Sequence, residues 1–308
     1  MTMRLRDFGS YTVGGRLHQV TEGAPRRLAV TREVSLTFDP RGHFAVEHAY
    51  VQYFVPEPRN DGPPVVLVHG GGLSGSMWER TPDNRPGWLH GLLAAGHEVH
   101  VLDNVERGRA GFAPGLWQGE PILRSLEDAW TLFRFGVAEG FEGRRPFDDQ
   151  RFPVDHLEGF ARMFVPRWLS TTPMQVAALT ALLQRLGGAV VICHSQGAEV
   201  TFGAMAQAAP VRGLIAVEPS ASPERPELLQ GCPTVLVQGD YLECNALWQG
   251  QRDRWASLEG ALHAQGSPVH TVSRETGLAA GHSHLPMLDR GSDACLDLCL
   301  AALGRLQA

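Results

Sequence analysis

The stretch that decides the fold is Ala189-Val190-Val191-Ile192-Cys193-His194-Ser195-Gln196-Gly197-Ala198. Residues 190–192 are typical of a short strand buried on both faces, and residues 198–209 favour a helix. A serine between them resembles the nucleophile elbow, Gly-x-Ser-x-Gly, in which a strained turn lifts the serine clear of the sheet. Gly197 fits this motif, and Cys193 replaces the first glycine with another small residue. These ten residues equally fit a serine that only caps the helix.

A glycine loop upstream favours the interpretation of the serine as a nucleophile. Residues 65–68 form a continuous apolar run that is typical of a central parallel strand, and His69-Gly70-Gly71-Gly72 follows it. Because glycines carry no side chain, the backbone N–H groups of such a loop can approach a ligand atom, which suits an oxyanion hole. Three glycines alone also fit a flexible loop, but a strand-end serine downstream favours the oxyanion hole.

Other segments predict an α/β fold with a mostly parallel central sheet flanked by helices. Alternating strands and helices imply right-handed parallel crossovers. The first sixty residues differ, because they alternate apolar and polar side chains, as in Tyr50-Val51-Gln52-Tyr53, and so predict antiparallel hairpins. The remaining strands are predicted at 97–103, 213–217, 234–238 and 268–272, and the helices at 88–95, 174–186 and 293–306.

Two carboxylates and two histidines follow predicted strands, at the edge where open α/β proteins place their sites. Glu218 and Asp240 each end a strand, and His282 and His284 lie in the loop after the last strand. The chain order is therefore glycine loop, serine, acid and histidine, which is the order of α/β-hydrolases. Spacing alone does not choose between the two acids or between the two histidines. A metal ion bound by both histidines is disfavoured, since no third ligand lies nearby in the sequence.

Residues 104–172 break the alternation of strands and helices. The segment is rich in aromatic residues from Phe112 to Trp168, set among prolines and glycines. It is too long for a simple connection and too apolar for a disordered linker. We therefore expect a helical lid over residues 105–172, inserted before the nucleophile strand of a single domain that spans residues 1–308. Its arginines are expected to be solvated or to tether the lid, and not to bind substrate.

The composition fits one large α/β core with an insertion, at 308 residues with 43% hydrophobic and 19% charged. A net charge of -6 without a basic run argues against nucleic acid or an anionic membrane as a partner. No segment approaches the ~20 apolar residues of a membrane helix, so we expect a cytoplasmic protein. The odd count of five cysteines favours reduced thiols, with Cys295 and Cys299 on a core-facing helix.

On these residues the chain is identified as a member of the α/β-hydrolase superfamily. It resembles a group of bacterial carboxylesterases in which a glutamate after the sixth strand is the triad acid. In that group two adjacent cysteines stand where this chain has Gly71 and Gly72, so the backbone donors remain here but a local disulfide is lost. The resemblance runs nearly end to end, through residues 9–16, 69–75, 78–83, 107–109, 133–136, 193–197, 217–219 and 283–285.

The resemblance implies a role for each candidate residue. Ser195 would be the nucleophile, His284 the base and Glu218 the acid that orients it, which leaves His282 and Asp240 as alternatives. The oxyanion donors would be the N–H groups of Gly71 and Gln196. The expected function is a serine esterase that cleaves a small carboxylic ester through an acyl-enzyme, without a cofactor or metal.

Other functions use the same residues and stay open at this stage. An acyltransferase, a lactonase or a C–C hydrolase could share the triad, because different nucleophiles compete for one acyl-enzyme. A non-catalytic protein of this fold that binds a small apolar ligand is an alternative from another class. A dehalogenase or epoxide hydrolase is disfavoured, since those enzymes carry an aspartate at the position of Ser195. The substrate is not indicated, nor is the choice between a monomer and a homodimer.

Overall fold

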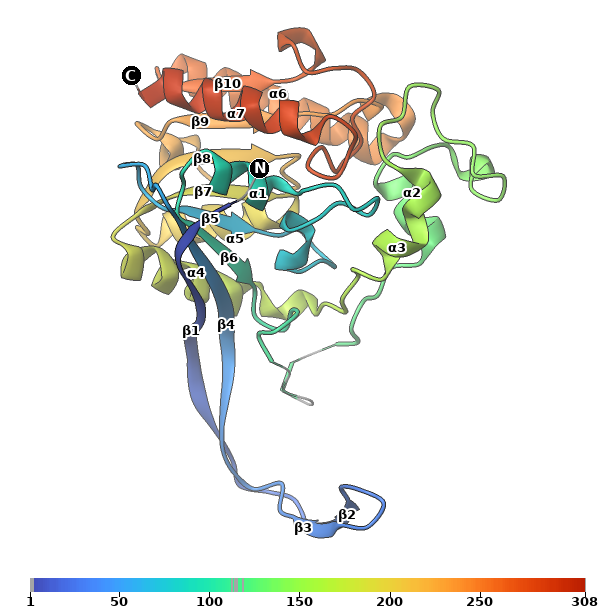
Figure 1. Ribbon diagram of the computed structural model, residues 1–308, viewed down its shortest axis with the longest axis vertical. Coiled ribbons are helices and arrows are strands. Elements are labelled where there is room, and N and C mark those ends of the chain that lie inside the picture. The colour runs from blue at the N-terminus through green and yellow to red at the C-terminus, as the bar shows by residue number, and fades with distance from the viewer. Residues whose placement is uncertain (1–2, 112, 114–115, 118, 308) are drawn as a thin grey trace.

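An eight-stranded sheet forms the centre of the computed structural model, which describes residues 3–111, 113, 116–117 and 119–307 (Figure 1). Its strands are β1 (Leu5–Val20), β4 (Gly42–Pro56), β5 (Val65–Val68), β6 (Val99–Asp103), β7 (Ala189–His194), β8 (Val211–Val217), β9 (Thr234–Val237) and β10 (Val269–Val272). The spatial order is β1-β4-β6-β5-β7-β8-β9-β10. Strands β5 to β10 pair in parallel, whereas β4 is antiparallel to both of its neighbours. The expected α/β class with a mostly parallel sheet is confirmed.

Helices cover both faces of the sheet. They are α1 (Trp88–Ala94), α4 (Thr172–Leu186), α5 (Gln196–Ala206), α6 (Ala246–Ala264) and α7 (Ser292–Gln307). Helices α1 and α7 pack into one apolar core, and α4, α5 and α6 pack into the other. Alternate residues of β7 serve the two cores, because side chains alternate along a strand: Ile192 belongs to the first, and Val191 and Cys193 to the second. Short 3-10 helices lie at Gly75–Trp78, Pro226–Leu229, Leu242–Cys244 and Arg274–Thr276.

Helix α7 confirms the prediction for its two cysteines. Cys295 and Cys299 are fully buried in the core beneath the helix, and both are free thiols. The other three cysteines are also free. Within the described part of the chain, no helix is both long enough and apolar enough to span a membrane.

Strands β1 and β4 form a long hairpin that extends well beyond the sheet (Figure 1). At its far end lies a separate small sheet made of β2 (Arg26–Ala29) and β3 (Ser35–Phe38). The alternation in the first sixty residues thus predicted the antiparallel pairing correctly. The projecting arm itself is a feature that the pattern did not predict.

The segment of residues 104–172 is less helical than expected. Its α-helices are α2 (Leu126–Leu132) and α3 (Leu157–Ala161), and its 3-10 helices lie at Ala138–Gly140, Val154–His156 and Leu169–Thr171. Turns and loops make up most of the remainder, because the prolines and glycines interrupt helical hydrogen bonding. Phe112, where the aromatic run begins, lies outside the described residues. That the segment acts as a lid stays a prediction.

The aromatic side chains of this segment extend the core of the sheet. Trp130, Phe133, Phe135, Phe152 and Phe160 are all buried, and they share one apolar cluster with residues of β5, β6 and α7. Phe135 and Phe152 stack with their ring centroids 3.9 Å apart. The segment is therefore anchored by burial of its own apolar surface, and it delivers Phe133 and its neighbours to the carboxyl ends of the strands.

Candidate active site

Ser195 stands at the corner between β7 and α5, in a conformation that an ordinary helix cap does not adopt. Its φ is 49° and its ψ is -116°, and its side chain makes no capping hydrogen bond to the helix. The interpretation as a simple N-cap is therefore wrong. A strained backbone of this kind in a non-glycine residue is found mostly at functional sites.

The residues around the corner explain how the turn is tolerated. A Cβ atom at Gly197 would lie 2.8 Å from the carbonyl oxygen of His69 and 2.9 Å from that of Val68, so only glycine lets α5 approach β5 this closely. Cys193, which replaces the first glycine of the motif, is fully buried. Burial raises the pKa of its thiol to about 12, so Cys193 stays a neutral packing residue and not a nucleophile.

His284 and Glu218 are joined by a buried hydrogen bond. The Nδ1–H group of His284 donates to Oε2 of Glu218 at 2.9 Å, and both side chains are at most 3% exposed. Glu218 follows β8, the sixth strand of the large sheet in chain order, and has a positive φ of 49°. Because Nδ1 is engaged by the carboxylate, Nε2 is the nitrogen left to exchange a proton with a reacting group.

Glu218 is held in place by a partner that the sequence did not identify. Arg134 donates from Nη1 to Oε2 at 2.9 Å and from Nη2 to Oε1 at 2.8 Å, and the N–H of Gly239 also donates to Oε1. Although burial by itself raises the pKa of Glu218, the charge of Arg134 and the hydrogen bond from His284 prevail and lower it to about 2. Glu218 is therefore an ionised carboxylate with fixed geometry.

Arg134 agrees with one part of the expectation for the arginines of this segment, because it is not solvated but ties the segment to Glu218. It is 0% exposed, donates from Nε to the carbonyl oxygen of Asp240 at 2.7 Å, and stacks on the ring of Trp248. Arg107 is buried as well and pairs with Glu106. The signal in the sequence was the position of Arg134 between two phenylalanines, since a charge among buried aromatic residues requires a charged partner.

Aromatic side chains pack against the imidazole ring of His284. Its ring is parallel to Phe133 at 5.8 Å and lies 4.6 Å from Trp248, measured between ring centroids. Burial lowers the pKa of His284 below its usual value, and the bond to Glu218 opposes this effect only in part. The imidazole is therefore neutral near pH 7, which is the protonation state that a general base requires.

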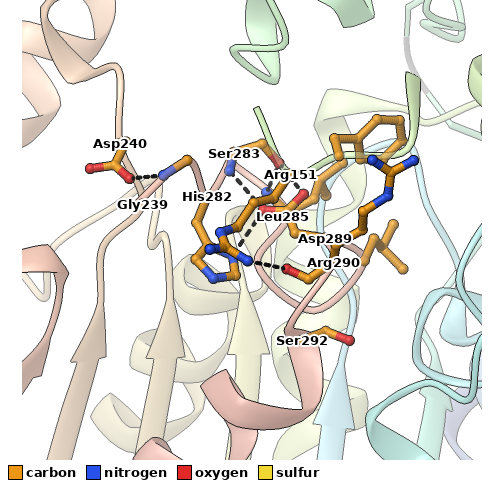
Figure 2. Close-up of polar contacts among 12 residues, drawn as sticks. Arg151, Gly239, Asp240, His282, Ser283, Leu285, Asp289, Arg290 and Ser292 are labelled. Carbon is orange, nitrogen blue, oxygen red and sulfur yellow. Dashed lines mark hydrogen bonds and ion pairs between the residues drawn. The ribbon is translucent and has the colours of Figure 1, made fainter. Parts of the chain in front are cut away.

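The alternative candidates His282 and Asp240 make structural contacts. His282 Nδ1 lies 3.1 Å from Oδ2 of Asp289, which also accepts the N–H of Ser283 (Figure 2). Asp240 accepts the N–H of Gly281 at 2.6 Å through its carboxylate. Figure 2 shows Asp289 inside the turn of this loop, with His282 directed toward it. These bonds order the loop that carries His284.

A pocket of about 240 Å³ brings the other sequence-predicted residues together. His284 and Ser195 both line it, as do Gly71 and Gln196, while Glu218 lies behind His284. Neither His282 nor Asp240 is among the described residues that line it. The rest of the lining comes from Arg124, Leu132, Phe133, Arg167, His194, Glu199, Ser220, Leu247, Trp248, Gln251 and Arg254.

The glycine loop fits tightly against the elbow. A Cβ at Gly70 would lie 2.5 Å from Nδ1 of His194, and one at Gly71 would lie 2.1 Å from Nη1 of Arg167. Among the described residues, the backbone N–H groups of Gly71 and Gln196 have no protein hydrogen-bond acceptor. Two unpaired donors beside one pocket, one of them at the start of α5, can stabilise a negative charge that develops there.

His194 supports the loop that carries His284. Its Nε2–H donates to the carbonyl oxygen of His284 at 2.9 Å, and burial lowers its pKa well below the usual value. His69 ties the glycine loop to the end of β6, because its Nε2 accepts the N–H of Asn104. Among the described residues, no group of three or more His, Cys, Asp or Glu side chains is placed to hold a metal ion.

Fold and site together define a protein with a serine at a strand-to-helix elbow and a buried histidine–glutamate pair beside it. The alpha/beta hydrolase family model matches residues 65–268, and the chain belongs to this family. It is similar over its whole length to a structure described as a novel bacterial esterase, with 30% identity, a TM-score of 0.87 and 98% of that chain covered.

A second relative is the probable secreted lipase phiG of Fungal sp. (strain ATCC 74256). The two are 29% identical over an alignment of 220 positions, which covers 65% of this chain and 56% of the lipase. The chain thus spans about half the length of this curated relative. Family membership with esterase-like and lipase-like relatives is consistent with the expectation of a hydrolase.

Proposed function

We propose that the protein is a serine hydrolase that cleaves carboxylic esters through an acyl-enzyme. The observation that carries the proposal is the hydrogen bond from His284 Nδ1 to the buried, ionised Glu218, with His284 and Ser195 lining one pocket. A neutral histidine oriented by a carboxylate beside a serine is the arrangement that activates a hydroxyl group.

Each step follows from this arrangement. His284 Nε2 takes the proton of Ser195 as Oγ attacks the ester carbonyl carbon, and Glu218 stabilises the imidazolium that forms. The N–H groups of Gly71 and Gln196 stabilise the oxyanion of the tetrahedral intermediate. The C–O bond then breaks, and the leaving alcohol takes the proton from His284. Water, deprotonated by the same histidine, cleaves the acyl-enzyme and restores Ser195.

The alternatives differ in what attacks the acyl-enzyme or in whether one forms. An acyltransferase, a lactonase or a C–C hydrolase would use the same three residues, so the triad does not distinguish them. We choose ester hydrolysis because the chain is similar to an esterase and a lipase. A binding protein without catalysis would have no need of a strained serine and an oriented base. The pocket of about 240 Å³ favours a small acyl or alcohol group.

The test is covalent labelling with a fluorophosphonate, read by intact mass and peptide mapping. We expect one adduct on Ser195, and Ser195→Ala should abolish both labelling and ester hydrolysis, with kcat lowered on the order of 10³ or more. Ser220→Ala is a matched control, because Ser220 lines the same pocket but does not stand at the strained elbow. A folded Ser195→Ala variant with activity within tenfold of wild type would refute the proposal.

A further inference from the structure

We infer that the ester carries an anionic group, such as a carboxylate, that binds to Arg167 with help from Arg254 and Arg124. This inference rests on the proposed function and adds the substrate class. Three arginines from separate parts of the chain line the pocket that contains Ser195, and Glu199 is the one carboxylate among the described lining residues. A pocket for a neutral ester has no need of this excess of positive charge.

Arg167 is the central residue of the cluster because no carboxylate among the described residues forms an ion pair with it. Its Nη1 donates to the neutral Oε1 of Gln196 at 2.9 Å. Its buried Nε has no hydrogen-bond partner in the part of the protein that the structure describes. Glu199 and Glu106 both lie near enough to raise the pKa of Arg167. Glu106 is itself engaged by Arg107 and by the N–H of Trp168, and no ion pair joins Arg167 to Glu199 among the described residues. Desolvation and the charge of Arg124 lower the pKa of Arg167, and the two carboxylates oppose this shift only in part.

The position of Arg167 places it beside the proposed oxyanion hole. Its guanidinium occupies the space that a side chain at residue 71 would need, and its bond to Gln196 joins it to the first residue of α5. An anionic group held there by two guanidinium N–H groups would fix the ester relative to Ser195, because paired hydrogen bonds define orientation as well as distance.

The other two arginines differ in how far they are neutralised. Arg254 donates from Nε and Nη2 to Oε1 of Gln251, which is neutral, and it forms no ion pair with a carboxylate among the described residues. Arg124 pairs with Asp128 in a partly exposed ion pair. Arg134 offers a contrast within the same segment, because it meets Glu218 in a two-point ion pair. A structural arginine is fully paired here, whereas Arg167 and Arg254 are not.

The experiment compares charged and neutral esters in matched pairs. One pair carries the charge on the acyl group, mono(4-nitrophenyl) adipate against 4-nitrophenyl hexanoate, and the other on the leaving group, 4-carboxyphenyl against 4-carbamoylphenyl butyrate. In at least one pair, wild type should favour the anionic member in kcat/KM by about tenfold or more at low salt. The preference should shrink as salt is added, since ions screen the attraction.

Variants separate a binding role from a structural one. Arg167→Gln should lower the anionic-to-neutral ratio of kcat/KM by about tenfold or more, mainly through KM on the anionic ester, and Arg167→Lys should restore part of it. Arg41→Gln removes the same charge from an exposed site paired with Asp39 and should leave the ratio unchanged. A ratio near one in wild type, or an Arg167→Gln variant with the wild-type ratio, would overturn the inference while leaving ester hydrolysis intact. A wild-type protein that cleaves none of the four esters would overturn the proposed function as well.

Discussion

Arg134 and Glu218 form a two-point ion pair with N···O distances of 2.9 and 2.8 Å, and neither side chain is exposed. One partner comes from the aromatic segment before α4 and the other from the end of β8. Because Glu218 also accepts the Nδ1–H of His284, the segment of residues 104–172 takes part in orienting the proposed base.

Removing Arg134 should destabilise the protein strongly. In Arg134→Met the carboxylate of Glu218 would stay buried without its cation, and loss of one partner of a buried pair costs about 3–5 kcal/mol in free energy of unfolding. Urea denaturation measures this quantity. Arg162→Met, at an exposed position of the same segment, should change stability by about 0.5 kcal/mol or less. Similar stability of both variants would show that the ion pair contributes little.

Exchange of the two strand-end carboxylates tests which one orients the base. Glu218→Gln should lower kcat at least about a hundredfold, because an amide does not hold the same tautomer or stabilise an imidazolium. Asp240→Asn should stay within about tenfold, since its carboxylate only accepts the N–H of Gly281. Both rates are to be measured on one short-chain ester at a temperature where each variant is folded. If kcat fell strongly in Asp240→Asn but stayed nearly normal in Glu218→Gln, Asp240 and not Glu218 would be the acid that orients the base.

The two histidines of the last loop should also differ. His284→Ala is expected to be close to inactive, because it removes the group that transfers the proton. His282→Ala should keep at least about a tenth of wild-type kcat but lose stability, because Asp289 then lacks one of its buried partners. Steady-state kinetics and thermal melting separate the two effects. Full activity in folded His284→Ala would exclude it as the base.

The pH dependence of activity should reflect the lowered pKa of His284. A base must be neutral, so kcat/KM should fall on the acid side, with a midpoint below the ordinary histidine value of 6.5. The profile of kcat/KM between pH 4 and 8 on a neutral ester measures this midpoint. A midpoint above 6.5 would contradict the burial of the imidazole.

Stability should decline in acid for two reasons that act in the same direction. Glu218 has a pKa of about 2 in the folded protein against 4.5 ordinarily, so its contribution of about 3 kcal/mol is present above pH 4.5 and lost as the pH falls toward 2. His284 and His194 have lowered pKa values in the folded protein. Below pH 6.5 the unfolded state therefore binds more protons than the folded state, which lowers the free energy of unfolding. Urea unfolding at a series of pH values should show this decline. In Glu218→Gln the loss of free energy of unfolding between pH 4.5 and 2 should be smaller than in wild type.

Local patterns in the sequence were sufficient to predict the central strands and the mostly parallel class of the sheet. The β-branched runs at residues 65–68 and 190–192 predicted strands because burial on both faces requires continuous apolar side chains. Gly197 predicted a close approach of strand and helix because only glycine lacks the Cβ that would collide. These features depend on neighbours within a few residues, so they can be read along the chain.

The sequence by itself determined the α/β class, the elbow at Ser195 and the pairs of candidates for acid and base. Tertiary structure alone decided which side chains meet: Glu218 with His284 and Arg134, and Asp289 with His282. It also placed Arg167 beside Gly71, bonded to Gln196 and without an ion pair among the described residues. The physical reason is that a buried charge takes its partner from whatever segment folds against it. The contacts of Glu218 with His284 and Arg134 join residues more than sixty positions apart, beyond the reach of any local pattern.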